Sequence, residues 1–142
     1  MVAVNPYLNF NGTTEEAFKF YRRVFGGEFI TLQRFDDTPE ASQIDEADRH
    51  KIMHVALLLS DGTILMGTDA LESMGHPLHC GNNFYLSISA DSESEADRLF
   101  GALADGGIIS HPIERTFWGA YFGLCIDRYG IQWMVNYDYL DQ

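Results

Sequence analysis

The chain repeats its own pattern of helix signals, and this internal repeat constrains the fold more than any other feature of the sequence. Thr13 stands where a helix N-cap would lie, and Glu16 follows three residues later. This spacing is the capping box, in which the hydroxyl and the glutamate each bind a backbone N–H that the first turn leaves unpaired. Ser92 and Glu95 repeat the box in the second half of the chain, so we predict one helix in each half.

Both predicted helices have the same apolar face and the same stop. Apolar residues recur at helical spacing, which indicates an amphipathic helix with one side in a core. Gly26-Gly27 and Gly106-Gly107 would end the helices, because glycine adopts the left-handed C-cap conformation without steric cost. The shift that places Thr13 on Ser92 also superposes Ala17 on Ala96, Phe20 on Leu99, Tyr21 on Phe100 and Val24 on Leu103.

A hairpin signal also occurs twice. Asp61-Gly62 separates two apolar runs, residues 52–59 and 63–68, and Asp-Gly between such runs favours a tight β-turn. When the first half of the sequence is moved along the second, the hairpins superpose at a smaller offset than the helices do. This offset places Asp61-Gly62 on Tyr129-Gly130 and Met66 on Met134. We assign the difference between the two shifts to an extra acidic loop in the first half.

Strand signals complete the repeat at residues 7–11, 28–34 and 84–90. We therefore predict an α+β fold of two tandem βαβββ modules. Each predicted sheet has an apolar face that needs covering, so neither module is expected to stand alone as a domain. The prediction is a single domain over residues 1–142, with module one at about 1–69, a linker at about 70–82 and module two at about 83–142.

The net charge and the cysteine content limit the classes of binding partner and the cellular compartment that we expect for the protein. With 9 Lys and Arg against 21 Asp and Glu, the net charge is −12, which repels nucleic acids and anionic membranes. No segment has the roughly 20 apolar residues of a membrane span, and the N-terminus lacks the features of a signal peptide. We expect a cytoplasmic protein with no nucleic-acid or membrane partner, and Cys80 and Cys125 as free thiols.

A set of short motifs runs in order from about residue 5 to about residue 137. They are Pro6-Tyr7-Leu8-Asn9-Phe10, Glu16-Ala17-Phe18-Lys19-Phe20-Tyr21 with Phe25-Gly26-Gly27, His54 before an apolar strand, Ile64-Leu65-Met66-Gly67-Thr68-Asp69, Thr116-Phe117-Trp118-Gly119, and Asp127-Arg128-Tyr129-Gly130 with Trp133. As a set they resemble the vicinal oxygen chelate superfamily, which includes glyoxalase I, extradiol dioxygenases and bleomycin resistance proteins. Within it the chain is most similar to the PhnB-like branch.

The resemblance implies a glyoxalase-like fold, in which eight strands form a cup-shaped mixed sheet with the helices outside. In metal-dependent relatives, ligands from the first and last strands of each module converge in the cup. The closing-strand ligands of the family lie about four residues after the hairpin glycine, where this chain has Met66 and Met134. The opening-strand windows, residues 5–7 and 83–85, offer no His, Asp or Glu.

A neutral thioether is a poor ligand for divalent zinc, nickel, manganese or iron. We therefore predict that the metal triad is missing and that no cofactor is bound; a divalent metal is the alternative. His54 is the one candidate catalytic residue, since an imidazole can act as a general base near neutral pH. The alternative, and the ordinary role of a lone histidine, is a half-buried side chain hydrogen-bonded to backbone.

The predicted ligand pocket combines His54 with aromatic, apolar and cationic side chains from both modules. Trp118 and Arg115 would form an aromatic wall with one cationic handle, or Trp118 packs at a module or subunit junction. Met66 and Met134 would form the pocket floor or fill the core, and Trp133 is assigned to the core. The full pocket set is Tyr7, His54, Met66, Tyr85, Arg115, Trp118 and Met134.

For two further clusters of residues we predict no role in catalysis or ligand binding. His76-Pro77-Leu78-His79-Cys80 holds three potential zinc ligands, but one short cluster with no matching pair favours linker histidines without metal. The acidic loop, residues 36–48, is expected to be solvated, although it could close over the cup.

Three functions remain open at the level of sequence. The first is a homodimeric protein that binds a small organic ligand in its cup without a catalytic metal. The second is a metal-dependent or acid/base enzyme of lyase, dioxygenase or transferase type that uses His54, Tyr7 or Tyr85. The third is a structural subunit with a vestigial pocket. A methyltransferase of the common kind is excluded, because no Gly-rich loop follows the first strand.

Overall fold

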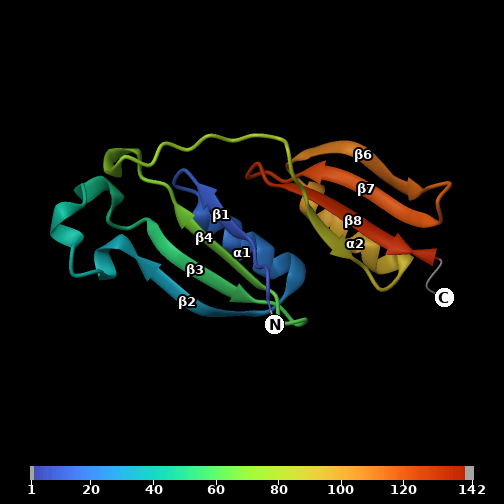
Figure 1. Ribbon diagram of the computed structural model, residues 1–142, viewed down its shortest axis with the longest axis horizontal. Coiled ribbons are helices and arrows are strands. Elements are labelled where there is room, and N and C mark those ends of the chain that lie inside the picture. Colours follow the sequence, from blue (N-terminus) through green and yellow to red (C-terminus); the bar gives the residue numbers. More distant parts are fainter. Residues whose placement is uncertain (1, 140–142) are drawn as a thin grey trace. The chain divides into compact units, whose positions relative to one another are not determined.

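The computed structural model describes residues 2–139. The chain divides into two compact units between His79 and Cys80, inside the stretch that we predicted as a linker. Each unit contains one strand, one helix and three further strands (Figure 1). In the first unit these are β1 (Tyr7–Phe10), α1 (Thr14–Phe25), β2 (Glu28–Arg34), β3 (Ile52–Leu58) and β4 (Ile64–Asp69).

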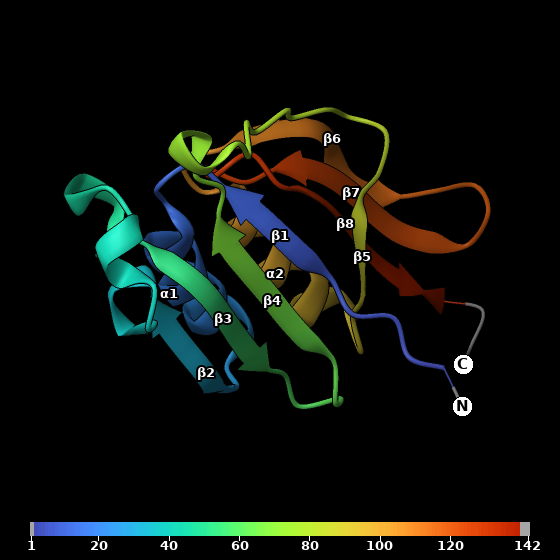
Figure 2. The same cartoon turned by 60° about the vertical axis from the view of Figure 1, so that its left-hand side comes forward.

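The first unit is a four-stranded sheet in the order β1-β4-β3-β2 (Figure 2). β1 pairs with β4 in parallel, and the other two pairings are antiparallel. The acidic segment between β2 and β3 forms three 3-10 helices, η1 (Phe35–Asp37), η2 (Ala41–Gln43) and η3 (Glu46–Asp48), and a fourth, η4 (Glu72–Met74), follows β4. The expected solvated loop is therefore a chain of short turns.

The second unit repeats this arrangement with the order β5-β8-β7-β6. β5 pairs with β8 in parallel, and the other pairings are antiparallel. The predicted tandem βαβββ modules and the α+β class with mixed strand pairing are confirmed. The elements are β5 (Leu86–Ser89), α2 (Glu93–Ala104), β6 (Ile108–Arg115), β7 (Ala120–Ile126) and β8 (Gln132–Asp138).

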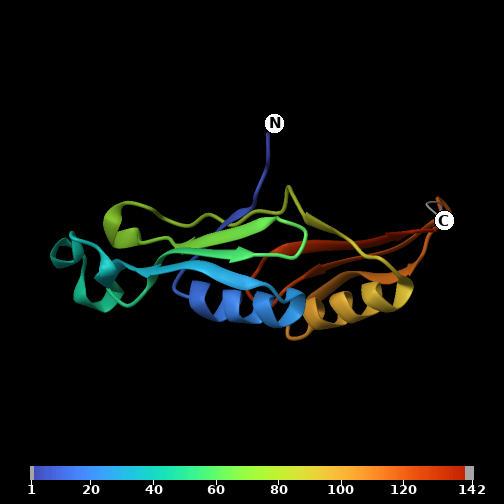
Figure 3. The same cartoon turned by 90° about the horizontal axis from the view of Figure 1, so that it is seen from below.

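Each helix lies along one face of its own sheet and forms the core there (Figure 3). The apolar helix positions predicted from the repeat are all buried. The strands present alternate residues to the helix, so Leu65 and Gly67 of β4 lie on the helix side while Met66 lies on the open side. Trp133 of β8 is buried on the helix side of its sheet, which confirms its assignment to the core.

The N-terminus of α1 differs from the prediction. Thr13 makes no side-chain cap, so the capping box predicted there is wrong. The carboxylate of Asp69 in β4 takes its place: Oδ1 accepts hydrogen bonds from the Gly12 N–H at 2.9 Å and the Thr14 N–H at 3.2 Å. Ser92 does cap α2, where its hydroxyl accepts from the Glu95 N–H at 3.1 Å.

Both hairpins close through the same turn, although it is longer than the two residues predicted. In the first, the Leu59 N–H donates to the Thr63 carbonyl and the Gly62 N–H donates back to the Leu59 carbonyl. The second repeats these bonds at the equivalent positions, around Gly130. Gly62 and Gly130 have φ of 94° and 93°, a conformation that side chains disfavour, which explains a glycine at both positions.

Two remaining expectations concern cysteines and membranes. Cys80 is exposed and Cys125 is buried, and both are free thiols. Among the residues that the structure describes, no helix is both long enough and apolar enough to span a membrane.

Candidate functional site

The open face of the first sheet brings together three of the predicted pocket residues. Tyr7 of β1 and Ala56 of β3 both pair with Met66 of β4, so the side chains of all three lie on the same face. His54 precedes Ala56 by two residues and shares that face. The rings of Tyr7 and His54 stack with centroids 5.8 Å apart and planes inclined by 24°. Tyr7, His54 and Met66 therefore form one cluster, open on the side away from α1.

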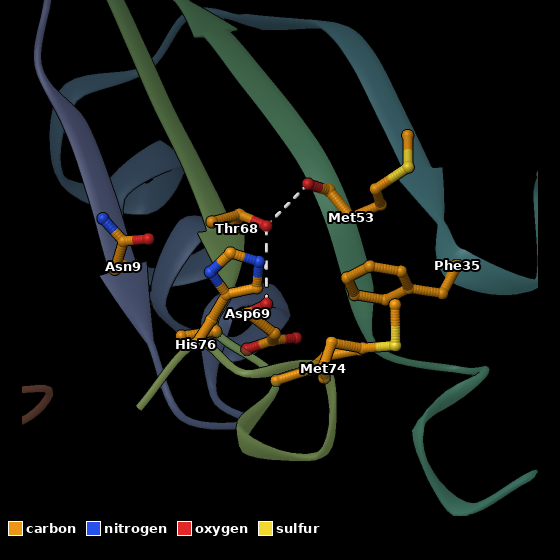
Figure 4. Close-up of a pocket in the computed structure, with 9 residues that line it drawn as sticks. Asn9, Phe35, Met53, Thr68, Asp69, Met74 and His76 are labelled. Carbon is orange, nitrogen blue, oxygen red and sulfur yellow. Dashed lines mark hydrogen bonds between the residues drawn. The ribbon is translucent and has the colours of Figure 1, made fainter. Parts of the chain in front are cut away.

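A cavity of about 340 Å³ lies further along the same unit (Figure 4). Asn9 and Thr68 are two residues beyond Tyr7 and Met66 on their strands, so they continue the open face. The η1 turn and the segment from η4 to His76 supply the other walls. The lining residues are Asn9, Phe35, Met53, Thr68, Asp69, Ala70, Leu71, Met74 and His76. Of the predicted pocket residues, Tyr7, His54 and Met66 neighbour lining residues on their strands, and none of the predicted set lines the cavity.

The cavity has a polar side and an apolar side. Figure 4 shows Asn9 entering from β1 on one side, and Phe35, Met53 and Met74 on the other, with Thr68 and His76 between them. The Thr68 hydroxyl donates to the Met53 carbonyl at 2.6 Å, which leaves its lone pairs free to accept. Such a lining is typical of a small-molecule pocket, where a few polar groups orient a largely apolar ligand.

Asp69 lines the cavity, but its carboxylate is hydrogen-bonded to other parts of the first unit and stabilises the fold. Besides the two N–H groups of the α1 terminus, Oδ1 accepts from the Thr14 hydroxyl at 2.7 Å, and Oδ2 accepts from the Ile52 N–H at 2.8 Å. Oδ1 thus accepts three hydrogen bonds and Oδ2 one, so both oxygens already have protein donors. The residue is 3% exposed. Asp69 therefore positions β1, α1 and β3 around the cavity rather than binding a ligand.

The open face of the second sheet is aromatic. Met134 pairs with Leu124 of β7 and with Ser87 of β5, so these residues share the open side. On that face the Phe122 ring lies 5.8 Å from the Trp118 ring and 5.6 Å from the His111 ring, in edge-to-face contacts. Trp118 therefore lies beside the open face of its own unit.

Arg115 lies on the other face of the second sheet, and Tyr85 lies just before β5. Arg115 pairs with Tyr121 in the sheet, on the side of α2, and its guanidinium lies 3.4 Å from Glu93 and over the Tyr139 ring at 5.4 Å. Tyr85 precedes β5, and the residue opposite Met134 is Ser87. The structure thus groups Trp118 with Met134 and separates both from Arg115, which points away from the open face.

The largest pKa shifts in the described residues belong to groups away from the open faces. A hydrogen bond to the Asp97 carboxylate raises the pKa of Tyr121 to about 12, and burial raises the pKa of the Cys125 thiol to about 11. Both residues lie on the α2 side of the second sheet. These shifts have structural causes, a hydrogen bond across to the helix and burial in the core.

The donor set on the open faces does not suit the metals of the superfamily. The positions that the resemblance assigns to its closing-strand ligands carry Met66 and Met134, and the residues opposite them are Tyr7 and Ser87. Across residues 2–139, no three His, Cys, Asp or Glu side chains are grouped so as to hold a metal ion. His76, one of the linker histidines, contributes to the cavity wall instead.

Several residues of the site were missed by the sequence reasoning, which stopped at the ligand positions of the superfamily. Asn9 and Thr68 could have been found, because strand alternation puts them on the face of Tyr7 and Met66. Phe35 and Met74 give no such signal, since their contribution depends on how the irregular η1 and η4 turns lie, and simple alternation would put Met53 of β3 on the face opposite His54.

Comparison with known proteins places this geometry in context. A profile of the family described as 3-demethylubiquinone-9 3-methyltransferase matches residues 2–136. The structure of PA1353 from Pseudomonas aeruginosa is 38% identical, with a TM-score of 0.87 and coverage of 97% of this chain and 98% of that one. The PhnB protein from Bacillus cereus is 25% identical, with a TM-score of 0.77 and coverage of 96% and 99%.

A more distant solved structure shares the fold. A glyoxalase/bleomycin resistance/dioxygenase family enzyme from Burkholderia phytofirmans PsJN matches with a TM-score of 0.64 and 19% identity, over 95% of this chain and 99% of that one. At this identity the likeness concerns the fold alone. The predicted glyoxalase-like fold and the PhnB-like resemblance are both confirmed.

Proposed function

Because the chain belongs to the family described as 3-demethylubiquinone-9 3-methyltransferase, whose PhnB-like members have the glyoxalase fold, we propose that it binds a small organic molecule on the open face of its first unit. The binding uses no catalytic metal triad. Such a protein would sequester or sense its ligand, or confer resistance to it.

The cavity of about 340 Å³ beside the Tyr7–His54 stack carries this proposal. Its volume falls at the small end of the range for ligand pockets, about 300–1,000 Å³. Its lining combines five apolar side chains with the polar groups of Asn9, Thr68 and His76. This composition supports a small ligand held by apolar contact and oriented by a few hydrogen bonds.

The donor chemistry supports the metal-free part of the proposal. Metal-dependent members of the superfamily need imidazole or carboxylate ligands on facing strands, and here both closing strands present thioethers. Asp69 is the one carboxylate in the cavity wall, and its oxygens are occupied by four protein donors. We therefore assign no chemical step to a metal.

The methyltransferase activity in the family's description finds little support in this fold. Nucleotide-type cofactors commonly place their phosphates or carboxylates at a helix N-terminus after a Gly-rich turn. In the first unit that position, at Gly12 and Thr14, is filled by the Asp69 carboxylate. The N–H groups that would bind a cofactor anion already have a partner.

A second candidate function is acid/base catalysis on the same open face. The observation in its favour is the stack of Tyr7 on His54, which holds an imidazole and a phenol within reach of one substrate. Turnover of a cavity ligand that is lost in His54→Gln, with binding retained, would establish this function. Equal binding and no turnover in the wild type would leave binding as the activity.

The proposed function is tested by filling the cavity. Ala70 lines it, so Ala70→Leu adds apolar atoms to its space, and Ala104→Leu in α2 adds the same atoms outside the lining. Native mass spectrometry and thermal shift against a library of small metabolites should find ligands that bind one per chain. We expect Ala70→Leu to abolish this binding and Ala104→Leu to preserve it.

Two results would overturn the proposal. Ligands that bind the wild type and Ala70→Leu equally would place the site elsewhere. Stoichiometric zinc, nickel, manganese or iron retained through purification without an affinity tag, and lost in His54→Ala, would contradict the metal-free assignment.

Self-association is the remaining part of the proposal. The outer strands carry exposed apolar side chains, Ile30 and Leu32 on β2 and Ile108 and Ile109 on β6, and edge strands of this kind invite pairing with another chain. Light scattering at micromolar concentration should give the mass of a homodimer, and the mass of a monomer would contradict this expectation.

A further inference from the structure

The cavity in the first unit has a chemical character that points to a class of ligand. We propose that it takes an uncharged aromatic molecule with an amide-like edge, that is, adjacent hydrogen-bond donor and acceptor groups in the plane of the ring. This inference rests on the proposed function, since it concerns the ligand of the same site.

The Asn9 side chain supplies the complementary edge. It is exposed on the open face of β1, at the polar side of the cavity (Figure 4), and no hydrogen bond engages its amide in residues 2–139. A carboxamide presents one acceptor oxygen and one N–H₂ donor side by side. It pairs bidentately with a partner that has the same two groups in reverse order, as asparagine does with an adenine edge.

The opposite side of the cavity selects for an aromatic ring. Phe35, Met53 and Met74 lie there together, from three different segments of the unit (Figure 4). Thioether sulfurs make favourable contacts with aromatic rings, and ring-to-ring contact with Phe35 adds to them. A saturated chain would gain from the apolar surroundings but not from these specific contacts.

The charges of the lining exclude an anion. It contains no Lys or Arg, and its one carboxylate, Asp69, is buried within it. A carboxylate or phosphate on the ligand would lose hydration, and the lining offers no permanent cation to compensate, because the His76 imidazole is charged only when protonated. A cation gains little either, because the Asp69 oxygens already accept four hydrogen bonds. An uncharged hydrogen-bonding edge is what remains.

Three isosteric probes test the class directly. Benzamide is neutral with the required edge, benzoate carries an anion on the same ring, and benzamidine carries a cation. Titration followed by NMR of ¹⁵N-labelled protein should show benzamide binding with Kd of about 1 mM, as expected for so small a ligand. We expect the Asn9 side-chain amide signal to shift, and benzoate to bind at least about tenfold more weakly.

A negative charge at position 9 should reverse the order in which benzamide and benzamidine bind. Asn9→Asp replaces the donor by a carboxylate oxygen, so benzamide should weaken by about tenfold or more and benzamidine should become the tighter probe. Asn82→Asp, an exposed residue of the linker outside the lining, makes the same charge change and should leave the order unchanged.

The outcomes separate this inference from the proposed function. Benzoate binding as tightly as benzamide to the wild type would overturn the ligand class without any variant. An unchanged order of probes in a folded Asn9→Asp would overturn the role of Asn9. If benzamide does not bind, but anionic library ligands bind and lose their binding in Ala70→Leu, the proposed ligand class is wrong and the proposed binding function stands. If no ligand is sensitive to Ala70→Leu, both fail.

Discussion

Replacement of Asp69 by asparagine tests whether one carboxylate holds the first unit together. The carboxylate joins the N-terminus of α1 to β4 and to the first residue of β3 through four hydrogen bonds of 2.7–3.2 Å. Asparagine keeps the shape but has a single acceptor oxygen. If that oxygen takes the place of Oδ1, the amide N–H₂ faces the Ile52 N–H, and two donors meet in a buried site.

The size of the effect follows from these contacts. Hydrogen bonds to a charged group contribute about 1.5–3 kcal/mol each, and a buried N–H left without a partner costs about 1–3 kcal/mol. Asp69→Asn loses the bond to Ile52 and the charge that strengthens the other three. Since Asp69 is 3% exposed, water cannot replace them. We expect the free energy of unfolding to fall by about 3–5 kcal/mol and the Tm by about 10–20 °C.

The assay must report on the first unit. Trp118 and Trp133 are the only tryptophans of the chain and both lie in the second unit, so tryptophan fluorescence follows that unit. Denaturation followed by far-UV circular dichroism covers both, and hydrogen exchange at the amides of Gly12, Thr14 and Ile52 measures the affected contacts directly. Exchange should accelerate most at Ile52.

A matched control removes the charge without the contacts. Asp45→Asn changes an exposed aspartate that precedes η3 and makes no side-chain cap there. It should alter the unfolding free energy by less than about 0.5 kcal/mol. A loss below about 1 kcal/mol in Asp69→Asn, or an equal loss in Asp45→Asn, would refute the reasoning.

Two further predictions concern the second unit. The hydrogen bond from Tyr121 to Asp97 raises the pKa of the phenol from 10.0 to about 12 in the folded protein. The bond therefore stabilises the fold fully below pH 10, and this stabilisation should be lost as the pH rises from 10 to 12. Urea unfolding of wild type and Tyr121→Phe should therefore differ less at pH 12 than at pH 10, and a constant difference would contradict the bond. Cys125 is buried with its pKa raised to about 11, so at pH 8 a thiol reagent should modify Cys80 alone in native protein and both cysteines after denaturation. The native Cys80→Ser variant should then not react with the thiol reagent. Rapid modification of this variant would show that Cys125 is accessible.

The sequence predicted those parts of the fold that depend on local periodicity. The buried residues of α1 and α2 and the glycines of both hairpins follow from short spacings within single elements, because helix and turn geometry impose them. Met66 and Met134 were placed correctly as equivalents because the same hairpin precedes each of them.

Contacts between distant segments were not predictable in this way. Asp69 lies 55 residues after Thr14, so its role as the cap of α1 has no local signal, and the local Thr13 box looked sufficient. The face of β6 on which His111 lies depends on a register shift in its pairing with β7, and a second shift returns Arg115 to the α2 side, the side of Ile109. The cavity needs the positions of η1 and η4, which follow no periodic pattern.

The two units show which positions the repeat preserves. On the helix side, Val55 pairs with Gly67 in the first unit, and Gly123 pairs with Val135 in the second. These are equivalent positions with the two residues exchanged. In each unit the glycine leaves room for an aromatic ring, since an added Cβ would lie 2.5 Å from Phe18 or 2.8 Å from Phe100.

The exchange keeps the volume of the pair constant, as a packed core requires. The open sides differ in chemistry instead, since His54 is equivalent to Phe122 and Thr68 to Asn136. Asp69, which ties β4 to α1, has Tyr137 as its equivalent. The proposed ligand binding therefore uses residues of the first unit, such as Thr68, that the second unit does not repeat at its equivalent positions.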